Sequence, residues 1–242
     1  AEELILRAAE RAKEKQTMLQ AHMNEYPGEV NFYMERKQLR PYEYLEKLEI
    51  LNEHFLGAHS LLLSEREKEL IQERGAILCH CPFSNCGKAV PDTPKLLKMG
   101  IPVGMGTDGA AHGGLSLWNE MKIFRSVMNI FHGVPNHDPK VMPAETIFKI
   151  ILEGGAAALD EEGNLGRLEA GYKADFISIN MNQAHLCPTG NKLRTLFECV
   201  GAGDVADMVV GGRLLMKDRE VLSMDEERIL YESGKYMETN GL

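Results

Sequence analysis

Residues 101–114 read IPVGMGTDGAAHGG, and this stretch is the clearest indication of the fold class. An apolar run leads into a single carboxylate, Asp108, which glycines and alanines follow. An apolar run of this kind is typical of a strand buried on both faces, as in a parallel sheet. The small residues that follow allow another group to approach the carboxylate closely. We therefore predict a buried strand that ends in a functional acid.

The same arrangement occurs three times earlier in the chain. We predict strands over residues 17–22, 55–63, 76–82 and 101–108, with the sequences TMLQAH, FLGAHSLLL, AILCHCP and IPVGMGTD. Helical patterns or helix-capping residues place helices over residues 2–15, 40–54, 64–74, 92–100, 115–131 and 143–159. Because strand and helix alternate and the strands are apolar throughout, the fold class is α/β.

The character of the sequence changes near residue 160. The segments GNLGRLEAGYKADFISIN (163–180) and ADMVVGGRLLMKDREVL (206–222) are short β patterns separated by glycines and charged residues. We predict an α/β part over residues 1–160 and, over residues 161–242, a small C-terminal β segment with a terminal helix.

The composition excludes several classes of protein. The chain has 242 residues, of which 44% are hydrophobic, and a formal net charge of −9. This charge disfavours nucleic acid and anionic membranes as partners, and no apolar run is long enough to span a membrane. Charged and apolar residues are mixed in the first fifteen positions, unlike a signal peptide. Five cysteines, three of them in CHCPFSNC, indicate reduced thiols and a cytoplasmic location.

Polar residues lie at or just beyond the ends of the predicted strands. They are His22, Glu25, His59, His80 and Asp108. Because the carboxyl ends of parallel strands share one edge of the sheet, we predict that His22, Glu25, His59 and Asp108 meet in one pocket. His22 and Asp108 could hold a divalent metal. Glu25 could move protons between an activated water and a leaving group, and His59 could orient the water or polarise the substrate.

Each of these residues, taken alone, has a simpler interpretation. A single histidine at a strand end is more often a satisfied core residue, and Asp108 could be a turn residue because Gly109 follows it. CHCPFSNC also suggests a zinc knuckle. We disfavour that, expecting Cys79 and Cys81 to point to opposite faces, and no second cysteine pair has zinc-finger spacing. Recurrence at four successive strands favours the functional site.

These residues lie in motifs that resemble a known family. AHMNE, GAHSLLLSE, CHCPFSN and GTDGAA resemble successive strand motifs of the amidohydrolase superfamily, in the branch with methylthioadenosine/adenosylhomocysteine deaminases, guanine deaminase and atrazine chlorohydrolases. GNLGRLEAGYKADF and the closing segment at 206–222 resemble the tail of that branch. The resemblance implies the C-terminal half of a TIM-type (β/α)8 barrel, strands five to eight, followed by a small β appendage.

The resemblance also implies roles for individual residues. His22 and Asp108 resemble metal ligands, while Glu25, His59 and Asp108 resemble catalytic groups. His80 and Asn85, together with His112 in the following loop, correspond to residues that line the substrate pocket. One divalent metal is implied, zinc in the first instance and iron as the alternative.

The sequence departs from the family pattern in two respects. The H-x-H pair of barrel strand one is absent, as are strands one to four, so the ligand set in this chain is incomplete. The loop over residues 86–93 is shortened, and His112, Gly113 and Gly114 replace an asparagine-rich stretch. We therefore expect either a homo-oligomer or pairing with a polypeptide that carries strands one to four.

Three functions are compatible with these motifs. The first is metal-dependent hydrolysis of a C–N bond other than a peptide bond, with deamination of a purine-like or other cyclic amidine substrate. The second is dechlorination of a triazine-like ring. The third is a non-catalytic half-barrel or fragment that needs an N-terminal partner. The partner in the first two cases is a small-molecule substrate.

Overall fold

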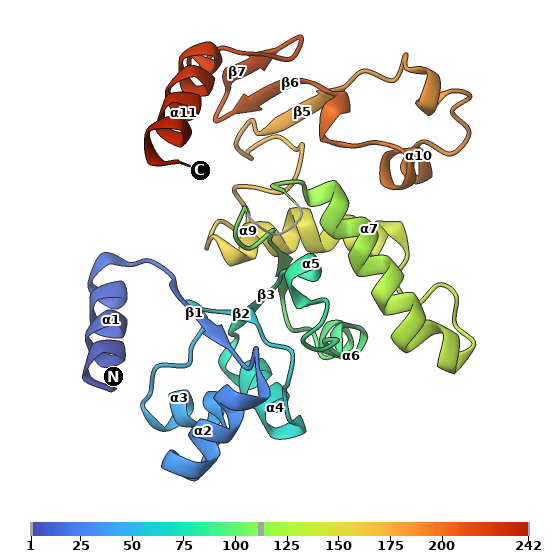
Figure 1. Cartoon of the computed structure of the whole chain (residues 1–242). Coiled ribbons are helices and arrows are strands. Elements are labelled where there is room, and N and C mark those ends of the chain that lie inside the picture. The colour runs from blue at the N-terminus through green and yellow to red at the C-terminus, as the bar shows by residue number, and fades with distance from the viewer. Residues whose placement is uncertain (1, 111–113, 242) are drawn as a thin grey trace.

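The first part of the chain is built on a four-stranded parallel sheet (Figure 1). The structure is a computed structural model, and it describes residues 2–110 and 114–241. The strands are β1 (Leu19–Met23), β2 (Phe55–His59), β3 (Ile77–His80) and β4 (Val103–Met105), in that order across the sheet. All four predicted strands are therefore present, and the α/β class is confirmed.

Helices precede, connect and follow these strands. They are α1 (Glu2–Lys15), α2 (Pro27–Lys37), α3 (Pro41–Lys47), α4 (Glu65–Arg74), α5 (Pro82–Asn85), α6 (Thr93–Lys98), α7 (Leu117–Met128), α8 (Ala144–Lys149) and α9 (Gly155–Ala158). Ser64 caps α4 by accepting from the Glu67 N–H at 3.2 Å, and Gly75 ends this helix with a φ of 69°. Both features follow from the capping pattern in the sequence.

Three predicted helices differ from those observed. The helix predicted over residues 40–54 ends at Lys47, and α2 was not predicted. The helix predicted over 115–131 begins at Leu117 and changes at Asn129 into a π-helix, Asn129–Gly133. The one predicted over 143–159 contains a π-helical segment, η3 (Ile150–Gly154), between α8 and α9.

The register of the sheet brings the strand ends together. Met23 of β1 pairs with His59 of β2, and His80 of β3 pairs with Met105 of β4. The residues that follow these strands therefore share one edge of the sheet. The hydrophobic core lies between the sheet and its helices, with Phe55, Ile71, Leu78 and Leu96 buried.

A close approach at η3 fixes one side of this core. A Cβ on Gly154 would lie 1.9 Å from the Val103 carbonyl oxygen of β4, so no larger residue fits there without movement. Glycine at this position lets the helical segment contact the strand backbone directly.

The C-terminal residues form a second, antiparallel sheet. Its strands are β5 (Phe176–Ile179), β6 (Val205–Val210), β7 (Arg213–Lys217) and β8 (Glu220–Val221), with helices α10 (Lys192–Glu198) and α11 (Glu226–Asn240). Helix α10 packs on α7, where Trp118 Nε1 donates to the Leu196 carbonyl at 2.9 Å.

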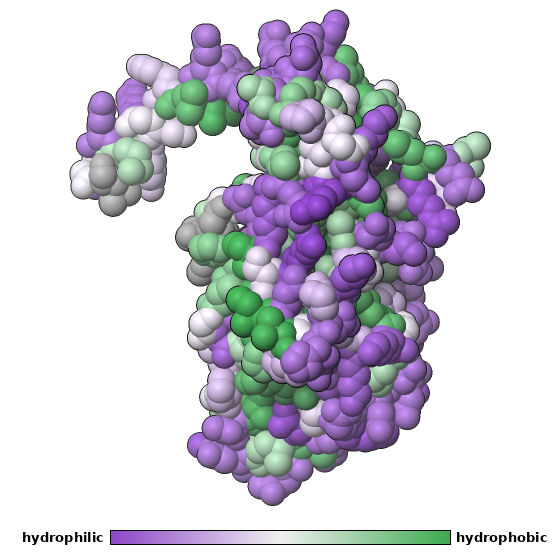
Figure 2. Space-filling model, turned by 90° about the vertical axis from the view of Figure 1, so that its right-hand side faces the viewer, coloured by the Kyte–Doolittle hydropathy of each residue, from purple (hydrophilic) through white to green (hydrophobic). Residues whose placement is uncertain are grey.

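Apolar patches occur on both the upper and the lower part of the molecule, with a hydrophilic band between them (Figure 2). The division at residue 160 stays a prediction.

None of the helices formed by residues 2–110 and 114–241 combines the length and the apolar character that crossing a membrane requires.

Candidate active site

His59 is the centre of a cluster at the carboxyl edge of the first sheet. Its Nε2 lies 3.6 Å from Glu25 Oε1 and 3.8 Å from Asp108 Oδ2. The His59 side chain is 1% exposed, whereas those of Glu25 and Asp108 are 14% and 26% exposed. The two carboxylates therefore form the accessible side of the cluster, and the imidazole forms its buried side.

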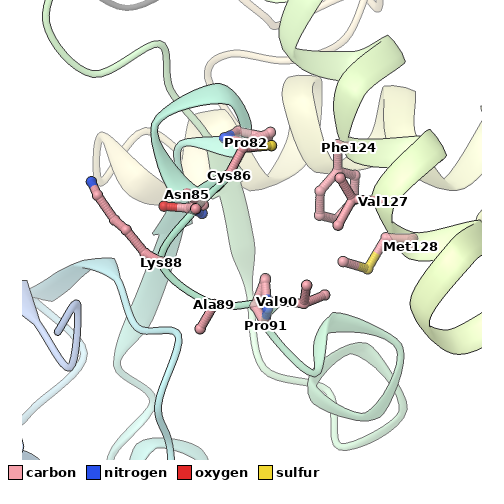
Figure 3. Close-up of a pocket in the computed structure, with 11 residues that line it drawn as sticks. Pro82, Asn85, Cys86, Lys88, Ala89, Val90, Pro91, Phe124, Val127 and Met128 are labelled. Carbon is pink, nitrogen blue, oxygen red and sulfur yellow. The ribbon is translucent and has the colours of Figure 1, made fainter. Parts of the chain in front are cut away.

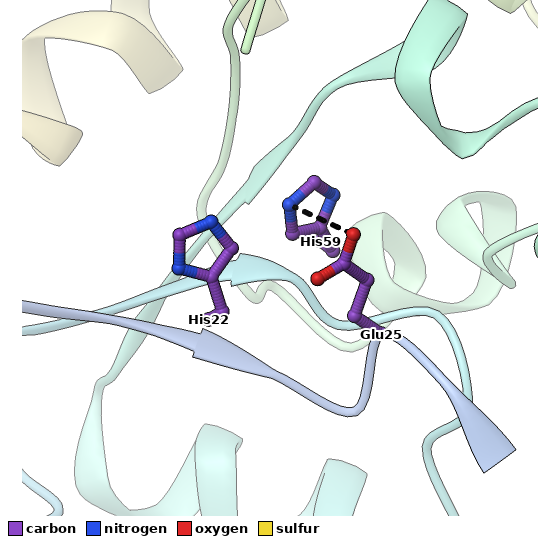
Figure 4. A group of neighbouring side chains, drawn as sticks. All are labelled: His22, Glu25 and His59. Carbon is purple, nitrogen blue, oxygen red and sulfur yellow. Dashed lines mark ion pairs between the residues drawn. The ribbon is translucent and has the colours of Figure 1, made fainter. Parts of the chain in front are cut away.

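His22 completes the cluster from the neighbouring strand. Its ring stacks on that of His59, with centroids 5.2 Å apart and an interplanar angle of 27°. Figure 4 shows the Glu25 carboxylate directed at the His59 ring, with His22 alongside. One ligand atom from each of His22, Glu25 and His59 lies within 4.8 Å of the others. Imidazole and carboxylate donors at such distances suit a divalent metal.

Buried hydrogen bonds hold His59 in its orientation. His59 Nδ1 donates to Asn85 Oδ1 at 2.9 Å, which directs Nε2 toward the carboxylates. The His59 carbonyl accepts from His80 Nδ1 at 2.8 Å. The backbone of His59 has a φ of 65°, which is unusual for a residue other than glycine. Asn24 and Asp108 share this left-handed conformation, with φ values of 50° and 59°. Such strained positions cluster at functional sites.

Lys88 and Ser84 connect the two carboxylates. Lys88 Nζ donates to Glu25 Oε1 at 2.5 Å and to Ser84 Oγ at 2.8 Å, and Ser84 Oγ donates to Asp108 Oδ2 at 2.6 Å. Burial acts to lower the pKa of Lys88, but the hydrogen bond and charge of Glu25 raise it overall. Lys88 is therefore a cation at neutral pH. Neither residue was predicted: Ser84 lies in the CHCPFSN motif, whereas nothing in the sequence around Lys88 indicates its approach to Glu25.

The turn that carries Glu25 is fixed by another acid. Glu29 accepts from the backbone N–H groups of Asn24, at 3.1 Å, and Glu25, at 2.9 Å. Burial raises the pKa of Glu29. The Asn24 side chain is itself tied to Glu67 at 3.0 Å, so the turn is anchored to helix α4.

Asn85, His80 and His112 are the residues predicted to line a substrate pocket. Asn85 and His80 are 4% and 1% exposed. The Asn85 side chain bonds to the His59 ring, and the His80 ring bonds to the His59 carbonyl. Burial lowers the pKa of His80 to about 4, so this histidine is neutral at pH 7. His112 lies outside the described residues. Contact of these three residues with substrate stays a prediction.

The expectation that Cys79 and Cys81 point to opposite faces is wrong. A Cβ built on Gly106 would lie 3.4 Å from Cys79 Sγ and 3.6 Å from Cys81 Sγ, so both thiols lie on the same side. The reason is that alternate residues of a strand share one face. The pair is still no zinc knuckle, because the remaining cysteines contribute no second pair at finger spacing.

Comparison with curated proteins gives relatives with named activities. A 5-methylthioadenosine/S-adenosylhomocysteine deaminase of Syntrophobacter fumaroxidans is 35% identical over 230 residues, which are 94% of this chain and 52% of that protein. The protein of the same name from Pyrococcus abyssi is 32% identical over 235 residues, 96% of this chain and 53% of that protein. The chain thus spans about half the length of the curated relatives it matches.

Solved structures share the fold over the same extent. An adenosine deaminase from Xanthomonas campestris with bound zinc matches with a TM-score of 0.89 at 24% identity, over 97% of this chain and 53% of that one. Atrazine chlorohydrolase TrzN from Arthrobacter aurescens TC1, complexed with zinc, matches with a TM-score of 0.82 at 21% identity, over 94% and 50% of the two chains. A family model described as the amidohydrolase family matches residues 1–215. On this evidence the chain belongs to the amidohydrolase family.

Proposed function

We propose that this chain carries the acid–base part of an active site that hydrolyses a C–N bond of a cyclic amidine. The observation that carries the proposal is the placement of Glu25 and Asp108 at 3.6 and 3.8 Å from His59 Nε2. Two carboxylates beside an imidazole can take a proton from water and give one to a leaving amine. The catalytic roles of these three residues are part of the proposal.

We further propose that β1 to β4 correspond to strands five to eight of a (β/α)8 barrel. Their parallel order and the coverage of about half of each relative support this assignment. In this arrangement the cluster faces the mouth of the barrel, where the loops after the strands form the active site. A polypeptide with strands one to four, or the remainder of a longer chain, would supply the opposite wall.

The donor set fits a divalent metal such as zinc. His22 and Asp108 are the proposed ligands. One ligand atom each of Glu25 and His59 lies within 4.8 Å of a His22 ring nitrogen, so both residues would lie beside the metal. A metal bound there supplies Lewis acidity, which makes water nucleophilic near neutral pH. Two similar structures are described with zinc, which supports zinc over iron.

The residues of this chain then account for the proton movements. Water adds to the amino-bearing carbon of the ring, and Asp108 and Glu25 accept its protons. Glu25 delivers its proton to the ring nitrogen, and Asp108 delivers the second proton to the departing amine, so that the C–N bond breaks and ammonia leaves. His59 Nε2, held by Asn85, orients the water or the substrate between the two carboxylates.

A 6-aminopurine nucleoside is the proposed substrate class. The relatives named as 5-methylthioadenosine/S-adenosylhomocysteine deaminases, and a 5'-deoxyadenosine deaminase of Methanosphaera stadtmanae at 30% identity, support this class. Dechlorination of a triazine is the second candidate, supported by the structural likeness to TrzN. Ammonia release from adenosine and 5'-methylthioadenosine, compared with chloride release from atrazine, distinguishes the two.

Glu25→Gln in the complemented or full-length enzyme tests the proposal. The substitution keeps the shape of the side chain but removes its ability to move protons, a role worth roughly 10²–10⁴-fold in rate. We expect turnover to be lost while most of the bound metal is retained, as measured by ammonia release and metal analysis of the same sample.

Glu35→Gln, on the exposed side of α2, is the matched control and should keep wild-type turnover. Near-normal turnover of Glu25→Gln would show that Glu25 is not the acid/base. If neither metal nor activity appears in the complemented enzyme, the non-catalytic half-barrel is the better description.

A further inference from the structure

A cavity lies beside Asn85, the residue that bonds to His59. It is bounded by the segment after β3 on one side and by helix α7 on the other, and its volume is about 310 Å³. It is lined by Pro82, Asn85, Cys86, Gly87, Lys88, Ala89, Val90, Pro91, Phe124, Val127 and Met128. A volume of this size is at the lower end of the range for small-molecule sites.

The side chains around this cavity are mostly apolar. Val90 projects from the loop, and Phe124, Val127 and Met128 face it from α7 (Figure 3). The Lys88 side chain points away from these residues, toward Glu25 at 2.5 Å. The Lys88 charge is therefore compensated by Glu25, and the apolar walls of the cavity favour a compact apolar molecule.

Asn85 places one buried polar group at this apolar wall. The residue is 4% exposed, and its Oδ1 already accepts from His59 Nδ1 at 2.9 Å. Its Nδ2 has no hydrogen-bond partner among the described residues. In Figure 3 the Asn85 oxygen is turned away from α7 and the nitrogen lies on the side of Phe124 and Val127. A buried donor without a partner is costly, so an acceptor at this point is favoured.

We propose that this cavity is a ligand site, separate from the hydrolytic centre, for a compact apolar molecule with one hydrogen-bond acceptor. The acceptor, a carbonyl or ether oxygen, binds Asn85 Nδ2, and the apolar body packs between Val90 and Val127. Asn85 would contact this ligand through Nδ2 while its Oδ1 contacts His59, so the two sites would share this residue. An ordered water is less suited, because it needs two or more polar partners.

Binding of acetophenone to the 242-residue chain tests the site directly. Acetophenone has an aromatic body and one carbonyl acceptor; α-methylstyrene has the same shape without the acceptor. We expect saturable NMR shifts of the Val127 and Met128 methyl groups with both compounds. The Asn85 Nδ2–H resonance should move downfield with acetophenone alone, because only that compound accepts its hydrogen bond. This readout does not depend on activity.

Val127→Trp should fill the cavity and weaken acetophenone binding by at least about tenfold. Val134→Trp is the matched control, because Val134 is 70% exposed and does not line the cavity; its affinity should stay within about twofold of wild type. Val90→Phe blocks the same space from the loop and replaces Val127→Trp if that variant does not fold.

Three results would overturn the proposal. These are the absence of saturable methyl shifts, an Asn85 amide that contacts only water in nuclear Overhauser spectra, and wild-type affinity in a folded blocking variant.

Discussion

Lys88 holds the carboxylate of Glu25 in position. The Lys88 side chain is 13% exposed and bonds to Glu25 and Ser84 at 2.5 and 2.8 Å. In the assembled enzyme, Lys88→Met should lower kcat by roughly 10–100-fold with little change in KM, because a charge-assisted hydrogen bond that orients the proton carrier is lost. Steady-state ammonia release measures both constants.

Two variants control this prediction. Lys88→Arg keeps the positive charge and should recover part of kcat, whereas Lys95→Met removes a lysine from a surface ion pair with Glu65 and should have no effect. Unchanged kcat in Lys88→Met would show that the contact between Lys88 and Glu25 has no role in turnover.

His80 makes the free energy of unfolding depend on pH. Its pKa is about 4 in the folded chain, lowered by burial, and about 6.5 when unfolded. As the pH falls below 6.5 the unfolded chain binds a proton that the folded chain excludes, so stability falls with pH. From pH 7 to pH 5 the loss is about 2 kcal/mol.

Urea unfolding at these two pH values measures the effect of His80. His80→Gln should lose about 2 kcal/mol less than wild type between pH 7 and pH 5. His137→Gln, a change at an exposed histidine, should behave as wild type. Equal pH dependence in His80→Gln and wild type would contradict the burial of a neutral His80.

The sequence predicted which strand-end residues meet, but not their contacts. His22, Glu25, His59 and Asp108 were found because each lies at or just after an apolar run, and parallel strands share an edge. Lys88 lies in a loop without periodic pattern, so its approach to Glu25 depends on the tertiary fold alone. The roles assigned to these residues stay predictions.

Gly154 allows helical segment η3 to contact strand β4. Both Gly154 and its neighbour Gly155 have helical dihedral angles, with φ values of −65° and −66°. A Cβ on Gly154 would meet the Val103 carbonyl oxygen at 1.9 Å, whereas one on Gly155 has nothing within 4 Å. Gly154→Ala should therefore lower the free energy of unfolding by about 1–3 kcal/mol through overpacking.

Gly155→Ala is the control for this prediction. It should be neutral or raise stability by about 0.4–1 kcal/mol, because alanine restricts the unfolded chain without a clash. Denaturant unfolding of both variants measures the difference. If the two have equal stability, the backbone of η3 is free to move away from β4.

The strands were easier to predict than the helices for physical reasons. Strands β2, β3 and β4 are buried along nearly their whole length, and their apolar runs are visible in the sequence. Strand β1 alternates between half-buried and exposed residues up to Met23, so the prediction that it is apolar throughout is wrong. The helix predicted over 40–54 stops at Lys47 because Ile50 and Leu51, which extended its pattern, are buried in the loop instead. Helix α2 was missed because it buries only Val30 and leaves Phe32 and Met34 exposed, so it has no clear apolar face.

The first sheet has two edge strands, β1 and β4, among the residues the structure describes. Unpaired backbone groups on such edges favour pairing with another chain. On β1 the Leu19 N–H donates to the His54 carbonyl, on the side of β2. Because successive N–H groups of a strand point to opposite sides, the Gln20 N–H points to the open edge. We propose that this edge joins a polypeptide with barrel strands one to four, a second copy, or the rest of a longer chain.

Association of the 242-residue chain through β1 is therefore expected in sedimentation velocity over a range of concentrations. Gln20→Pro removes the N–H on the open edge while the bonds to β2 remain, so it should shift association to higher concentration. Gln20→Thr keeps the N–H and should associate like wild type. A wild-type chain that sediments as a monomer at every concentration, unfolds sharply and has full hydrolase activity would contradict the half-barrel interpretation. In that case the cluster at His59 would need no opposite wall, and its ligands would all have to come from the residues of this chain.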